Sequence, residues 1–117
     1  MSGPQMDKYQ RAAQFWSVLA YAARNRQLPT YKMMEELTGI PKHGQGPILD
    51  VLVAYCDINK LPKLTTLLIA EDDGLPQDGS EDAATVSRHQ TQVFSYDWLK
   101  RCAPTVEQLK VALGARV

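Results

Sequence analysis

A set of side chains between residues 31 and 45 has the chemistry to contact phosphate groups. Lys32, Lys42, His43 and Gln45 cluster around the expected N-termini of two helices. Free backbone N–H groups and the helix dipole attract anions at such positions, and neighbouring basic or amide side chains commonly contact phosphate. Two interpretations stay open at this point: a nucleic-acid backbone contact, and an ordinary solvated turn.

The cysteines and histidines form no catalytic or metal-binding motif. Cys56 falls on an apolar helical face, which indicates a buried structural thiol. Cys102 lies beside two basic residues, but no His or Asp motif accompanies it. His43 and His89 do not have zinc-ligand spacing relative to the cysteines. We therefore expect no catalytic residue, no metal and no cofactor.

The elements that position the basic side chains lie between residues 28 and 75. Thr30 is a good N-cap for a first helix, and Gly39 can take the positive φ that ends it. Pro47 suits the first position of a second helix, where no N–H is needed. The short apolar run from Leu64 to Ala70 is rich in β-compatible residues and is predicted as a strand. The predicted order is helix, turn, helix, strand.

This stretch resembles the DNA-binding domain of O6-alkylguanine-DNA alkyltransferases and alkyltransferase-like proteins. Thr30-Tyr31-Lys32-Met33-Met34 stands where that family has Thr-Tyr-Gly-Glu-Leu-Ala. The family's Asn-Pro-Leu-Pro turn is similar to Asn59-Lys60-Leu61-Pro62, and its Val-Trp-x-x-Leu helix to Phe15-Trp16-Ser17-Val18-Leu19. The likeness covers about residues 14 to 76 and implies a winged helix-turn-helix.

The resemblance also implies a role for Tyr31, and it marks one departure. In the family, the matching tyrosine lies at the DNA backbone and helps to rotate a base out of the stack. The alternative for Tyr31 is a half-buried amphipathic side chain. The family's catalytic Pro-Cys-His-Arg falls on Thr66-Leu67-Leu68-Ile69, where no nucleophile stands. Alkyl transfer at that position is excluded, and we expect a protein that is not an enzyme.

Length and composition favour one ordinary globular domain over residues 1–117. The chain is 44% apolar, and no apolar run approaches the roughly 20 residues of a membrane span. Residues 1–5 are expected to form a loose tail without the features of a secretory signal. Two cysteines make no disulfide framework, so a cytoplasmic location is expected.

Charge is balanced overall but unevenly placed along the chain. Net charge is zero, whereas strong nucleic-acid-binding domains are usually basic. Residues 1–66 hold eight Lys or Arg against five Asp or Glu, whereas residues 67–117 hold five against eight. The acidic half contains a long polar loop, predicted over residues 71–90, followed by a second strand from Thr91 to Ser95. These two strands would form the wing hairpin.

We therefore expect a mainly α fold with a small β-hairpin, a winged helix-turn-helix. The first functional hypothesis is a non-enzymatic nucleic-acid-binding protein that contacts DNA weakly, by backbone or shape, through Tyr31, Lys32, Lys42, His43 and Gln45. The alternative is a protein-interaction module, a small regulator or inhibitor. Its partner surface would be the acidic loop and the C-terminal region: Asp72, Asp73, Asp78, Glu81, Asp82 and Trp98.

Overall fold

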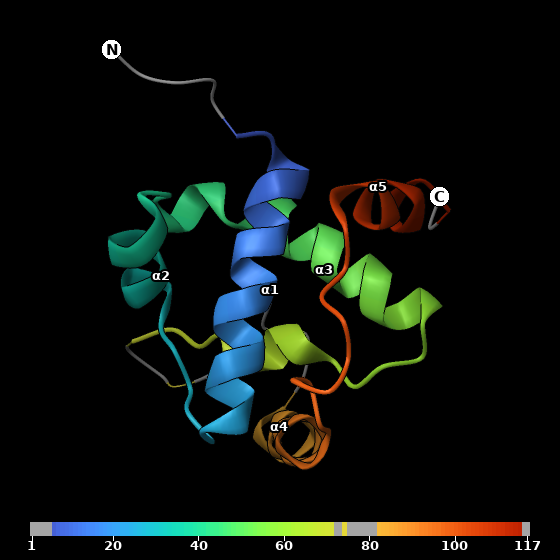
Figure 1. The fold of residues 1–117 in the computed structure, drawn as a ribbon. Coiled ribbons are helices and arrows are strands. Elements are labelled where there is room, and N and C mark those ends of the chain that lie inside the picture. Colours follow the sequence, from blue (N-terminus) through green and yellow to red (C-terminus); the bar gives the residue numbers. More distant parts are fainter. Residues whose placement is uncertain (1–5, 72–73, 75–81, 116–117) are drawn as a thin grey trace.

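A long first helix runs through the middle of the protein (Figure 1). The computed structural model describes residues 6–71, 74 and 82–115. Helix α1 (Lys8–Arg24) opens with a reciprocal capping box, in which Asp7 Oδ1 accepts from Gln10 N at 2.8 Å and Gln10 Oε1 accepts from Asp7 N at 2.9 Å. One face of α1 is buried in the core: Ala12, Phe15, Trp16, Leu19, Ala20 and Ala23. The buried residues recur at helical spacing, as expected for one face of a helix.

The two helices expected to carry the basic side chains also form. Helix α2 (Tyr31–Thr38) is capped by Thr30, whose hydroxyl accepts from the N–H of the third helical residue, and it ends at Gly39 with φ of 79°. A 3₁₀ turn, η1 (Lys42–Gly44), connects it to helix α3 (Gly46–Ile58). In Figure 1, α2 lies on one side of α1, and α3 lies on the other.

The strand predicted from Leu64 to Ala70 is wrong. Its first half is a 3₁₀ turn, η2 (Leu64–Leu67), which packs against α1, α3 and α4. A short apolar run fits a buried strand or a buried helical turn equally well, and burial against three helices decides for the turn. Only one isolated parallel bridge follows, in which Tyr31 N donates to Ile69 O at 3.2 Å and Ile69 N donates to Pro29 O at 3.1 Å.

The second predicted strand, Thr91 to Ser95, is also wrong, because it is the end of helix α4 (Ala83–Ser95). Asp82 caps this helix, and Val86 and Val93 are buried on one face two turns apart. This helical spacing overrides the β-propensity of the residues around Val93. Residues 83–90 of the predicted loop are therefore helical, and residues 1–5, 72–73, 75–81 and 116–117 lie outside the described residues.

The fold is consequently mainly α, and the residues that the structure describes form no β-hairpin. After a turn at residues 97–100, helix α5 (Val106–Ala115) starts with a second capping box. Gln108 N donates to Thr105 Oγ1, and Thr105 N donates to Gln108 Oε1. Helix α5 packs against α1 and α3.

Three aromatic rings occupy the centre of the core. The ring centroid of Trp16 lies 5.4 Å from that of Tyr55 and 5.4 Å from that of Trp98, both in edge-on arrangements. Trp98 comes from the turn after α4, and its Nε1–H donates to Val93 O at 2.8 Å. The contacts of Trp16 thus join α1 to α3 and to the chain between α4 and α5.

Helices α1 and α3 end in the same way, with a basic residue in the left-handed conformation. Arg26 has φ of 54° and Lys60 has φ of 55°. In α3, Lys60 N donates to Asp57 O and Leu61 N donates to Cys56 O, which is the Schellman arrangement. The same pair of bonds closes α1 around Arg26. Glycine usually occupies this position, because a side chain there is strained.

Replacing Lys60 with glycine should therefore stabilise the fold by about 0.5–1 kcal/mol. The left-handed conformation costs a non-glycine residue about 1–2 kcal/mol, and the greater freedom of glycine in the unfolded chain offsets about 0.4–1 kcal/mol of the gain. Arg26→Gly should gain less, because the Arg26 guanidinium lies 5.8 Å from the Phe94 ring centroid. Urea denaturation measures both changes.

The matched control is Gln14→Gly, at an exposed position within α1. It should destabilise the fold by about 0.5–1 kcal/mol, because glycine is a poor residue inside a helix. Destabilisation by Lys60→Gly to the same extent would contradict the conformational explanation.

Candidate nucleic-acid interface

Gln45 holds the turn that carries the predicted phosphate-binding side chains. Its side chain is fully buried, and Nε2 donates to Tyr31 O at 3.0 Å and to Ile40 O at 3.1 Å. The prediction that Gln45 contacts phosphate is therefore wrong. The carbonyl groups of Tyr31 and Ile40 need hydrogen-bond donors from inside the protein. The side-chain amide of Gln45 donates to both. Gln45 is a positioning residue that ties η1 to the start of α2.

Tyr31 is also inside the protein rather than on its surface. Its side chain is only 5% exposed, which fits neither a DNA contact nor the half-buried alternative. Its backbone N–H donates to Ile69 O, so both its ring and its backbone are fixed by neighbouring segments. The Nζ of Lys42 lies 5.6 Å from the Tyr31 ring centroid, within the range of a cation–π contact.

Lys32, Lys42 and His43 remain exposed, as their predicted role requires. Two contacts bring their segments together. Gln45 links the turn of Lys42 and His43 to Tyr31, the neighbour of Lys32, and Lys42 lies over the ring of that same tyrosine. The structure thus places Lys42 at the start of α2, where Lys32 lies in the chain, and His43 in the adjoining turn η1.

An acidic residue that the sequence did not single out lies at the same place. Glu71 Oε1 accepts from Lys32 N at 2.7 Å, so its carboxylate caps the N-terminus of α2. This backbone hydrogen bond lowers the pKa of the exposed Glu71 carboxyl below its ordinary value, and Lys42 lowers it further. The backbone bridge at Ile69 places Glu71 there, and no local sequence signal marks a bridge of one residue pair.

Of the residues predicted for the alternative, protein-binding surface, the structure describes only Trp98 and Asp82. Trp98 is 2% exposed and hydrogen-bonded to Val93 O, so the prediction that it meets a partner at the surface is wrong. Its indole is part of the core because it fills the space beside Trp16. Asp82 caps α4 by accepting from Thr85 N at 2.8 Å, which lowers its pKa. Asp72, Asp73, Asp78 and Glu81 lie outside the described residues.

The thiols follow the predicted pattern. Cys56 is buried, and burial raises its pKa to about 11, so its thiol is neutral at physiological pH. Cys102 is exposed. Within the described part of the chain, no three His, Cys, Asp or Glu side chains are grouped so that they could hold a metal ion. No helix in that part has the length and apolar character needed to cross a membrane.

Comparison with known proteins identifies no relative: no family model, no curated protein and no solved structure matches the chain.

The role of Gln45 can be tested with Gln45→Met, which keeps the length of the side chain and removes its donor. The carbonyls of Tyr31 and Ile40 would lose that partner inside the protein, so the free energy of unfolding should fall by about 2–3 kcal/mol. Gln92→Met, at an exposed position of α4, should change it by less than about 0.5 kcal/mol. Equal values for the two variants in urea denaturation would contradict the positioning role.

Proposed function

We propose that the protein is a non-enzymatic nucleic-acid-binding protein that contacts the phosphate backbone through Lys32, Lys42 and His43. The observation that carries the proposal is that Lys42 lies over the ring of Tyr31 at the start of α2, where the exposed Lys32 is the next residue in the chain. Two exposed cations beside the N-terminus of α2 provide positive charge for one phosphate group, and the helix dipole adds to it. The contacts of Gln45 with the carbonyls of Tyr31 and Ile40 tie together the backbone segments that carry these cations.

The proposed binding is weak and independent of sequence. Two acidic side chains, Asp50 and Asp57, are exposed on α3, the helix that would face the nucleic acid in a helix-turn-helix. Base readout in the major groove relies on Arg, Lys, Asn or Gln, and carboxylates near the backbone repel phosphate. Backbone contact by two or three cations is the mode that agrees with these charges.

The order of α1, α2 and α3, and the packing of α1 against α3, support a distant relation to the winged-helix core of the alkyltransferases. The bridge between Thr30 and Ile69 takes the place of the first strand pairing, and α4 takes the place of the wing. Leu67, at the position of the family's nucleophilic cysteine, is fully buried and apolar. This environment agrees with a protein that takes up no alkyl group at this position.

The double variant Lys32→Glu with Lys42→Glu should abolish binding to duplex DNA at low salt. For the unchanged protein, the logarithm of the binding constant should fall with the logarithm of salt concentration with a slope of about −1.8 to −2.7, as two or three phosphates are neutralised. Fluorescence anisotropy of a labelled duplex, measured across salt concentrations, gives both quantities.

The control for this variant is Lys100→Glu with Lys110→Glu, which changes the net charge equally at two other exposed lysines. It should retain most of the affinity, because Lys110 is on α5, across α1 from α2 (Figure 1). An equal loss in both double variants would mean that only net charge matters, and would remove Lys32 and Lys42 from the proposed site.

Glu71→Gln should strengthen the same binding by about two- to fivefold at low salt, because it removes a negative charge from the N-terminus of α2. The pKa of Glu71 is lowered, so its carboxylate stays charged as the pH falls to its ordinary pKa of 4.5. The advantage of the variant should therefore persist down to that pH and vanish only below it. Glu36→Gln, on the exposed side of α2, is the control and should have less effect.

A further inference from the structure

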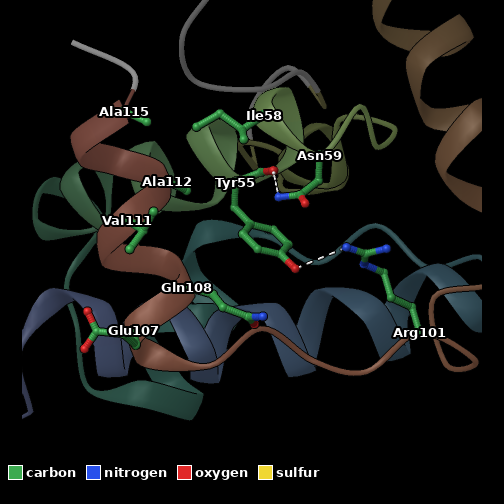
Figure 2. Close-up of a pocket in the computed structure, with 9 residues that line it drawn as sticks. All are labelled: Tyr55, Ile58, Asn59, Arg101, Glu107, Gln108, Val111, Ala112 and Ala115. Atoms are coloured by element: carbon green, nitrogen blue, oxygen red, sulfur yellow. Dashed lines mark hydrogen bonds between the residues drawn. The ribbon is translucent and has the colours of Figure 1, made fainter.

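A pocket of about 350 Å³ lies on the side of the protein formed by α3 and α5. Its walls come from the last turn of α3, from α5, and from the segment between α4 and α5 that contains Arg101. Figure 2 shows Tyr55 in the middle of the pocket, with α5 on one side and Arg101 on the other. This volume is at the lower end of the range for small-molecule sites.

Arg101 brings a positive charge to one end of the pocket, and the groups that contact its guanidinium are neutral. Its Nη2 donates to Tyr55 Oη at 3.2 Å, and its guanidinium carbon lies 5.9 Å from the Tyr55 ring centroid. Its Nε–H is buried and has no hydrogen-bond acceptor among the described residues. The hydrogen bond to Tyr55 raises the pKa of Arg101, and contact with the Tyr96 hydroxyl adds to this, so the side chain stays charged.

The opposite end of the pocket is apolar. Ile58, from the end of α3, is 46% exposed, and Val111, from α5, is 63% exposed. The small side chains of Ala112 and Ala115 leave space between them, and the Tyr55 ring extends this surface towards Arg101. Large aliphatic side chains exposed beside a cavity lose unfavourable contact with water when an apolar group covers them.

We propose that this pocket binds a small organic monocarboxylate with a short aliphatic or aromatic body. The carboxylate would accept from the Nε and Nη2 edge of Arg101 after a rotation of that side chain opens the edge to the pocket. Such paired, charge-assisted bonds are the strongest that a guanidinium makes with an organic anion. The apolar body would lie on Ile58 and Val111. This proposal is independent of nucleic-acid binding by the α2 surface.

The charges around the pocket favour a carboxylate over a phosphate ester. Arg101 is the one cation among the described residues that line it, and a doubly charged phosphate is normally held by several donors or cations. Glu107 also lines the pocket and would oppose a second negative charge, although Figure 2 shows its carboxylate directed away from Tyr55. Gln108 offers an amide N–H₂ group, because its Oε1 already caps α5.

The proposal can be tested by titrating the ¹⁵N-labelled protein with sodium hexanoate and, separately, with hexan-1-ol. Hexanoate should shift the amide signals of residues 55–59 and 107–112 and bind at least about tenfold more tightly than the alcohol, because only the carboxylate pairs with Arg101. Butanoate should bind more weakly than hexanoate, since it covers less of the apolar surface.

Three variants assign the effect to individual groups. Arg101→Gln should weaken hexanoate binding by at least about tenfold and leave hexanol binding unchanged. Val111→Ser, at an exposed position, should reduce the difference between hexanoate and butanoate. Lys100→Gln is the matched control, because it removes a neighbouring charge that does not line the pocket, and it should have little effect. The thermal unfolding of each variant shows whether its fold is retained.

Equal binding of hexanoate and hexanol, or unchanged hexanoate binding in a folded Arg101→Gln variant, would overturn the proposal. Failure of every carboxylate to shift these signals would overturn it as well. A further pair of ligands shows whether the carboxylate belongs to a peptide C-terminus or to a free small acid. The pair is a short peptide ending in leucine, with either a free or an amidated C-terminus. Tighter binding of the free peptide than of hexanoate would identify a chain terminus as the ligand, and the reverse order would identify a free small acid.

Discussion

The edge-on packing of Trp16 against Trp98 and Tyr55 is the contact on which the rest of the structure depends. Trp16 lies in the central helix, Tyr55 in α3, and Trp98 in the turn that leads to α5. Aromatic side chains bury more area than any other type, and edge-on pairs add about 0.5–1.5 kcal/mol beyond that area. One ring thus fixes the relative positions of three segments, and the two surfaces with proposed functions lie on different sides of this centre.

The same helix, α3, connects those surfaces. Its N-terminus follows Gln45, which ties η1 to α2, and its last turn contributes Tyr55 and Ile58 to the pocket. The Tyr55 ring packs against Trp16 while its hydroxyl meets Arg101. The buried Gln45 therefore positions the segment that carries Lys42. Tyr55, which belongs to both the core and the pocket, positions the charged Arg101 side chain.

The helices were predictable from sequence where capping and periodicity agreed. The Thr30 cap stands at the predicted place, and the Asp7–Gln10 and Thr105–Gln108 boxes are sequence patterns of the same kind at the starts of α1 and α5. The hairpin was not predictable, because Leu64–Ala70 is too short for its period to separate strand from helical turn. Around Val93, β-propensity favoured a strand, whereas the spacing of Val86 and Val93 favoured a helix. Packing against η2 buries the helical face, and the segment is a helix.

The candidate sites were less predictable than the helices, because they depend on contacts between distant segments. Lys32, Lys42 and His43 were identified by their chemistry and are exposed, but exposure of Tyr31 and Gln45 could not be judged from residue type alone. The Glu71 cap depends on the bridge at Ile69, and the pocket depends on the approach of Arg101 to Tyr55. Neither pair is adjacent in the sequence.

The position of Trp98 has a consequence for how the protein is made. Trp98, a core partner of Trp16, lies far from it in the sequence, and α5 packs over the same two helices, α1 and α3. During synthesis the early helices emerge long before these residues, so their apolar faces have no complete core to bury them. The core can therefore be completed only after the region around α5 has left the ribosome.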